Sequence, residues 1–259
     1  MNILFAILII CLLVFLYILN NSKDKQETFS KIDSHIVSLC SVGAESRVSL
    51  RSPAPSGRVD KIIYINLDHR IDRNQEIIEE LTTYFPDTPI IRLSAIYQPD
   101  NGALGCLQSH IMMLKYALYN FPGENVLFCE DDLQFLKDPK GYIYNVSNDN
   151  KFNNWDVVMV ADNTNKSKKT ENKKIVKVSD SQTASCYLVK SYYIPKILEI
   201  FEKDLEIYNT TKIWKTLYCN DQSWKILQKK DNWYAFTDKI ASQRKSYSDI
   251  EKKVVDYKV

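Results

Sequence analysis

The stretch "VLFCEDDLQF" (residues 126–135) joins an apolar run to three adjacent carboxylates, Glu130, Asp131 and Asp132. The apolar run predicts a buried strand, so the acids follow directly where that strand leaves the core. Two interpretations fit this pattern. The acids could form a solvated turn, as charge runs usually do. They could instead hold a divalent cation, because Mg²⁺ and Mn²⁺ prefer hard oxygen ligands.

The chain around this stretch predicts an α/β domain. Apolar runs predict strands, and 3.6-residue periodicity predicts helices between them. The strands are expected at residues 61–67, 90–93, 125–129, 155–163 and 186–189, and the helices at about 68–85, 102–120, 191 onward and 221–230. Alternation of this kind is typical of an open, largely parallel sheet flanked by helices, whose ligand site lies at the carboxyl ends of the strands. The lysine-rich residues 165–174 are expected to form an exposed loop or hairpin tip.

The N-terminal region differs in character from the rest. Ile3–Leu19 contains no charged residue and no helix breaker, which predicts a transmembrane anchor over residues 1–20; a cleaved signal peptide is the alternative. Residues 21–57 are polar and end in "RSPAPSG", which is typical of a flexible stem, and the folded domain is expected at 58–259. We therefore expect a single-pass membrane protein.

The sequence leaves open on which side of the membrane the folded domain lies. The lysines that follow the apolar segment favour a cytoplasmic domain. Three N-x-S/T sequons suit a lumenal one, at Asn145, Asn165 and Asn209.

Composition narrows the functional class. The 34 Lys and Arg residues against 32 Asp and Glu residues give a net charge of +2, which argues against a nucleic-acid partner. The six cysteines are scattered and contain no C-x-x-C pair, so their spacing indicates neither a disulfide framework nor a zinc site.

Seven motifs stand in order along the chain: "INLDHRIDR", "GALGCLQSH", "CEDD", "WDVVMVADN", "ASCYLV", "DQSW" and "SQRKSYSDIE". From Lys61 to Glu251 the chain thereby resembles glycosyltransferase family 25, which includes bacterial lipooligosaccharide sugar transferases and the catalytic domains of collagen galactosyltransferases. The resemblance implies a GT-A-type fold, a UDP-sugar donor and a Mn²⁺ or Mg²⁺ cofactor. We accordingly expect a hexosyltransferase, inverting in mechanism, that moves galactose or glucose to a hydroxyl of a glycan or protein.

The resemblance also assigns roles to the acids. It implies that Asp132 binds the metal, and that Glu130 or Asp131 binds the metal or the donor ribose. The chemistry suits these residue types, since a metal held by carboxylates neutralises the leaving diphosphate without a proton transfer.

Donor contacts are expected from two further motifs. Asn66, Arg70 and Arg73 follow the first strand, where they could contact the uridine and diphosphate; the alternative is a pair of surface arginines at a helix start. Ser109 and His110 lie together within a helix. A structural, hydrogen-bonded histidine is the usual case there, and the resemblance places both residues in the site instead.

An inverting transferase also needs a base for the acceptor hydroxyl, and the candidates are Asp221 and Asp162. Asp221 could equally be a helix N-cap. In the tail, the resemblance implies that Arg244 belongs to a polar segment that covers the donor. Trp224 and Trp233 could stack on sugars or be core aromatics.

Two other classes stay open. A metal-dependent phosphohydrolase also gathers carboxylates at strand ends, although it usually has a basic groove. A membrane-anchored carbohydrate-binding protein is the other. A donor screen with Mn²⁺ separates the three.

Overall fold

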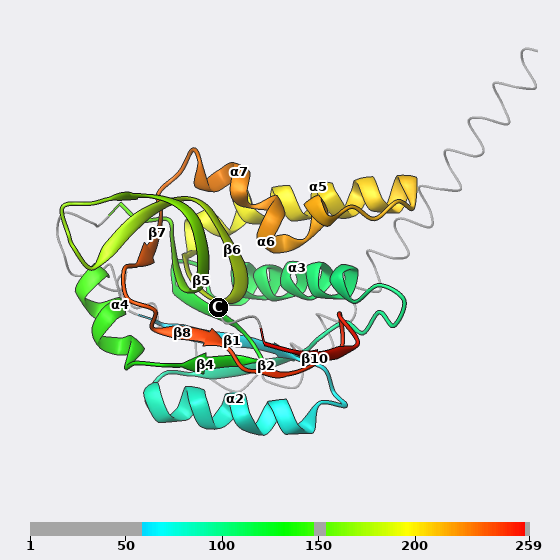
Figure 1. The fold of residues 1–259 in the computed structure, drawn as a ribbon, viewed down its shortest axis with the longest axis horizontal. Coiled ribbons are helices and arrows are strands. Elements are labelled where there is room, and N and C mark those ends of the chain that lie inside the picture. Colours follow the sequence, from blue (N-terminus) through cyan, green and yellow to red (C-terminus); the bar gives the residue numbers. More distant parts are fainter. Residues whose placement is uncertain (1–58, 148–153, 257–259) are drawn as a thin grey trace, which may run out of the picture. The chain divides into compact units, whose positions relative to one another are not determined.

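The computed structural model describes residues 59–147 and 154–256. Its centre is a six-stranded sheet with the order β2-β1-β3-β6-β5-β7 (Figure 1). The strands are β1 (Lys61–Asn66), β2 (Ile90–Ser94), β3 (Asn125–Glu130), β5 (Val157–Lys169), β6 (Ile175–Lys190) and β7 (Trp233–Phe236). β1 pairs in parallel with β2 and β3, and β5 with β7, whereas β6 is antiparallel to its neighbours. The predicted α/β class and largely parallel sheet are confirmed, with β6 as the reversed strand.

Helices cover both faces of the sheet. α3 (Gly102–Asn120) and α5 (Ile194–Thr211) pack on one face, and α2 (Ile71–Tyr84) and α4 (Pro139–Ser147) pack on the other (Figure 1). Short elements complete the domain: η1 (Ser191–Tyr193), η2 (Thr216–Tyr218), α6 (Asn220–Ser223), α7 (Lys225–Gln228), the pair β4 (Leu133–Phe135) with β8 (Ala241–Gln243), and the pair β9 (Ser246–Ser248) with β10 (Lys253–Val255).

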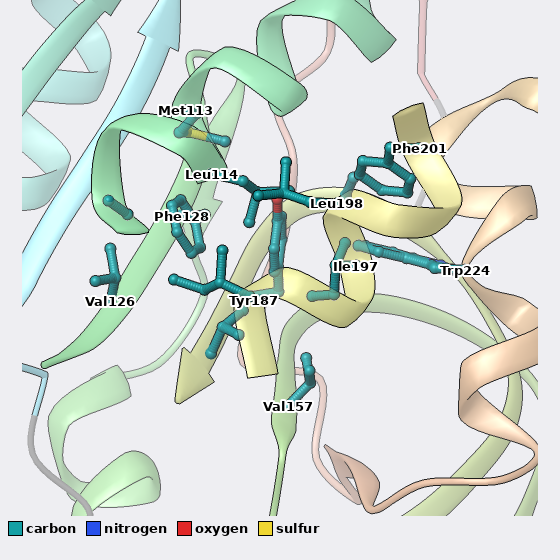
Figure 2. Packing of buried hydrophobic residues seen from close by; sticks show 14 of the residues in the cluster. Met113, Leu114, Val126, Phe128, Val157, Tyr187, Ile197, Leu198, Phe201 and Trp224 are labelled. Carbon is teal, nitrogen blue, oxygen red and sulfur yellow. The ribbon is translucent and has the colours of Figure 1, made fainter. Parts of the chain in front are cut away.

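Strand β3 shows how the core fixes the direction of the acids. Val126 and Phe128 belong to the buried cluster under α3 and α5, and Leu127 and Cys129 belong to the cluster under α2. Figure 2 shows Val126 and Phe128 packed with residues of α3 and α5. Each fully buried side chain of this size contributes roughly 1.5–3 kcal/mol, so the register of β3 is strongly fixed. Because side chains alternate, Glu130 lies on the α3 side.

Trp224 and Trp233, for which stacking on sugars was one of two interpretations, belong to this core. Trp224 and Trp233 are both 0% exposed, and their rings meet edge to face with centroids 5.2 Å apart. The interpretation as core aromatics is therefore confirmed.

The hairpin β5–β6 is longer than predicted. The predicted strands 155–163 and 186–189 are parts of strands that run to Lys169 and start at Ile175, with register shifts along the pairing. The lysine-rich residues 165–174 thus lie at the tip of this hairpin. Of the two predicted forms, an exposed loop or a hairpin tip, the structure has the second.

The predicted anchor and stem, residues 1–57, lie outside the described residues. Within 59–147 and 154–256, no helix combines the length and apolar character that crossing a membrane requires.

Candidate functional site

A cleft opens at the carboxyl ends of β1 and β3. These neighbouring parallel strands end at Asn66 and Glu130, with Ile65 paired to Glu130. The cleft is lined by the acid triplet, by the start of α3 and by the C-terminal segment 243–250. Open α/β sheets bind ligands at this edge because the loops there diverge from the strand ends.

The acid triplet is not a solvated turn, and that interpretation is wrong. Asp131 is 8% exposed, and the side chains of Glu130 and Asp132 are 18% and 12% exposed. Glu130 ends β3, and Asp131 and Asp132 form the turn into β4. The C-terminal segment closes over this turn, with the backbone N–H of Arg244 donating to the Asp132 carbonyl at 2.5 Å.

Asp131 is held by the protein on both oxygens. Arg73 Nη1 donates to its Oδ1 at 2.9 Å, and Asn66 Nδ2 donates to its Oδ2 at 2.8 Å. Burial raises the pKa of Asp131, while Arg73 and Asn66 oppose that rise. Asp131 therefore fixes the turn that carries Asp132.

Glu130 and Asp132 share a neighbour, Ser185 of β6. The Ser185 hydroxyl lies 3.3 Å from Glu130 Oε2 and 3.4 Å from Asp132 Oδ1. Burial first, and then the negative charge of Glu130, raise the pKa of Asp132 to about 7, although Arg73 opposes them. Burial and the neighbouring Glu130 thus disfavour the ionised form of Asp132.

Sequence reasoning assigned no role to Ser185. The strand predicted at residues 186–189 lies within β6, and the alternation of side chains along it is the signal that could have placed Ser185 on one face of the sheet. Cys186 faces Cys129 on the α2 side, with the two sulfurs 3.7 Å apart, so Ser185 must point to the side of Glu130.

His110 is fully buried and contacts the acid pair through Glu130. Its Nε2 lies 3.0 Å from Glu130 Oε1, and its Nδ1 lies 2.8 Å from the Tyr187 hydroxyl. Since an ionised carboxylate only accepts, Nε2 carries the proton of this contact. Burial raises the pKa of Glu130, but the hydrogen bond and charge of His110 outweigh burial and the pKa lies below its usual value.

Ser109 makes internal contacts at the cleft wall. Its hydroxyl donates to the Gly105 carbonyl at 2.7 Å and accepts the Ile96 N–H at 2.8 Å. A Cβ on Gly105 would lie 2.6 Å from the Ile96 carbonyl oxygen, so α3 and the loop after β2 pack closely here. Ser109 ties these two elements together.

The three predicted arginines join α2 to the C-terminal segment. Arg70 Nη1 donates to Asp249 at 2.6 Å, and Arg73 Nη2 donates to the Ser246 hydroxyl at 2.6 Å. Arg244 instead lies against α2, with Nη2 3.1 Å from Glu80. Of the three, Arg73 lines the cleft.

The segment at the cleft mouth packs tightly on α3. A Cβ on Gly102 would lie 2.9 Å from the Ile250 Cα. Gly102 is the first residue of α3, and the backbone that approaches it belongs to the chain's own tail.

Asp221 lies inside the short helix α6, whose N-cap is Cys219, so the N-cap interpretation is wrong. Its Oδ2 accepts the N–H of Thr183 at 3.1 Å. Thr183 has φ 79°, a strained conformation for a β-branched residue, and this contact helps to hold it. Burial raises the pKa of Asp221, and the charge of Glu130 adds to the rise.

Asp162 does not end a strand as predicted, because β5 continues past it through paired residues to Lys169. Its carboxylate accepts the Thr164 hydroxyl. Burial raises its pKa, with Thr164 and the charge of Lys239 opposing. Of the two candidate bases, Asp221 is the one whose pKa responds to the acid cluster.

No protein-family model matches the chain, and no curated protein matches its sequence. Among solved structures, the chain is similar to a glycosyltransferase involved in glycosylation of the major capsid of PBCV-1, with 10% identity, TM-score 0.46, and 75% of this chain and 97% of that chain covered. It is similar to the glycosyltransferase GlyE of Streptococcus pneumoniae TIGR4 (11% identity, TM-score 0.41, 70% and 45% covered). It is also similar to an active-site mutant of LgtC (13% identity, TM-score 0.39, 64% and 69% covered).

Proposed function

We propose that the chain is a metal-dependent glycosyltransferase that moves a hexose from a UDP-sugar to a hydroxyl of a glycan or protein. The main support is the pairing of Glu130 and Asp132 across the Ser185 hydroxyl, at 3.3 and 3.4 Å, in a cleft at the carboxyl ends of parallel strands. A GT-A-type fold and membership of glycosyltransferase family 25 are part of the proposal, as is anchorage through residues 1–20.

The ligand set suits a hard divalent cation. Two carboxylates and a hydroxyl converge, and Mn²⁺ and Mg²⁺ prefer such oxygens. Burial and the charge of Glu130 raise the pKa of Asp132 to about 7, so the ionised form of this carboxylate is disfavoured. A cation bound nearby would stabilise that ionised form. When bound, the ion would neutralise charge that develops on the diphosphate leaving group.

The chain's own groups prepare this site. Asn66 and Arg73 fix Asp131, and so they fix the turn that presents the Asp132 carboxylate. Arg73 Nη1 lies 3.9 Å from Asp132 Oδ2 in the cleft wall, where its charge would also stabilise the diphosphate. His110 orients Glu130 through the 3.0 Å contact.

In the proposed mechanism Asp221 accepts the proton of the acceptor hydroxyl, with Asp162 as the alternative base. The raised pKa of Asp221, caused mainly by burial, suits a base that works near neutral pH. Arg70, through its 2.6 Å contact with Asp249, holds the C-terminal segment over the donor cleft, and Arg244 ties that segment to α2.

The test is a donor screen with the full chain in detergent. UDP release is measured from a panel of UDP-sugars with Mn²⁺, Mg²⁺ or EDTA, first without acceptor and then with glycan and peptide hydroxyl acceptors. We expect slow, metal-dependent UDP release that an acceptor accelerates, and the anomeric configuration of the product tests inversion. Cleavage of phosphodiesters instead would favour a phosphohydrolase, and sugar binding without turnover would favour a binding protein.

A further inference from the structure

A second cluster of metal-ligand atoms meets the acid pair on its α3 side. Cys106 and His110 lie one helical turn apart on α3, and both face Glu130 at the end of β3. The Cys106 sulfur is 3.7 Å and the His110 Nε2 is 3.0 Å from Glu130 Oε1. The three ligand atoms all lie within 4.8 Å of one another.

The two oxygens of Glu130 face different neighbours. Oε1 faces Cys106 and His110, whereas Oε2 faces the Ser185 hydroxyl at 3.3 Å, on the side of Asp132. A carboxylate oriented in this way can offer one oxygen to each of two separate positions. The Cys106 side is therefore a distinct place from the hard-oxygen side.

We propose that Cys106, His110 and Glu130 form a binding site for a thiophilic divalent cation such as Zn²⁺. One thiolate, one imidazole nitrogen and one carboxylate oxygen make the mixed ligand set that Zn²⁺ accepts, and three protein ligands leave a fourth position for water or a ligand. Cys106 and Glu130 both line the cleft, so that position has access to solvent.

The surroundings of the ligands suit this assignment. On binding, the thiol of Cys106 loses its proton to solvent, and the imidazole proton moves from Nε2 to Nδ1. The Tyr187 hydroxyl, 2.8 Å from Nδ1, can accept that proton's hydrogen bond and so hold the ligating tautomer. The Asn220 amide lies 3.7 Å from the Cys106 sulfur and can donate to the thiolate.

The test uses Co²⁺ as a spectroscopic probe on the full chain, reduced with a phosphine and freed of metal. We expect one equivalent to bind with a thiolate-to-cobalt charge-transfer band, and Zn²⁺ to displace it. Cys106→Ser should abolish the band, and His110→Gln should weaken Zn²⁺ binding by more than the roughly 10–100-fold that loss of an outer-shell partner costs, because it removes a ligand. Cys219→Ser is the matched control, a nearby half-buried thiol outside the ligand set, and should keep the band.

A measurement on the unmutated chain removes any dependence on the folding of variants. Peptide mapping measures the alkylation rate of each cysteine. Zn²⁺ should slow the alkylation of Cys106 and leave the alkylation rate of Cys219 unchanged. Asp132→Asn should keep the cobalt band, because the inference does not rest on the proposed function. The absence of a band in the unmutated chain, an equal band in Cys106→Ser, or loss of the band in Asp132→Asn would each overturn the proposal.

Discussion

The acid triplet at Glu130–Asp132 and the lysine run at the end of β5 both come after a buried stretch of strand, yet they have opposite surroundings. The acids lie under the C-terminal segment, and Asp131 has hydrogen bonds to both oxygens. Lys166, Lys168 and Lys169 are exposed in the last part of β5, which pairs with β6 but not with β7. A charge run thus indicates a site when other elements close over it, because burial forces each charge to find a partner.

The sharpest test of this comparison removes charge from each region in turn. Asp132→Asn should lower metal-dependent transfer on the order of 10³-fold or more, because loss of an ion that stabilises a leaving group costs several kcal/mol. The double change Lys168→Ala, Lys169→Ala should leave the rate unchanged. Initial rates of UDP release with Mn²⁺ measure both, and equal losses in the two variants would remove the distinction between the regions.

The next effect in size concerns Asp221. Asp221→Asn should lower turnover on the order of 10²–10⁴-fold with little loss of UDP affinity, because the carboxylate acts on the acceptor proton. Asn keeps an oxygen that can accept the Thr183 N–H, so the melting temperature should stay near that of the unmutated chain. A normal rate would transfer the role of base to Asp162, and the matching Asp162→Asn variant checks that outcome.

Burial of the acids also predicts a pH-dependent stability. Burial and Glu130 raise the pKa of Asp132 from 3.8 to about 7, so between these values the folded state holds a proton that the unfolded state has released. In metal-free protein this group's contribution to the free energy of unfolding therefore falls as pH rises through that window.

The Asp132→Asn variant has no group to titrate at this position. The melting temperature of the variant minus that of the unmutated chain should therefore be larger at about pH 8 than at about pH 5, both measured in EDTA. The expected gain is several degrees, since 1 kcal/mol corresponds to about 2–4 °C at this size. Thermal unfolding at both pH values measures it. The same difference at the two pH values would mean that Asp132 is not desolvated as described.

The smallest effect concerns the segment that closes over the acids. Gly102→Ala would place its Cβ 2.9 Å from the Ile250 Cα and displace the tail, and overpacking of this kind costs about 1–3 kcal/mol. Tryptic cleavage after the exposed Lys245 should become faster. Gly141→Ala on α4 is the matched control, because no atom lies within 4 Å of its added Cβ. Equal cleavage rates in the two variants would contradict the packing of tail on α3.

Local patterns along the chain are enough to predict the elements and the position of the acids. The apolar run before Glu130 and the helical spacing in 102–120 are local patterns, and the structure has a strand and a helix at those places. Such patterns suffice because burial of one face of an element depends on the periodicity of its own residues.

Which polar groups meet depends instead on how the elements pack together. Ser185 reaches Glu130 across 55 positions of sequence, and Cys106 and His110 reach it across 24 and 20. Cysteine spacing gave no sign of a metal site, and the pattern around Asp162 gave no sign that β5 continues past it. These contacts depend on strand order, on the pairing register and on how α3 packs over β3. Those are set by the total burial of two hydrophobic layers, which no local stretch of sequence specifies.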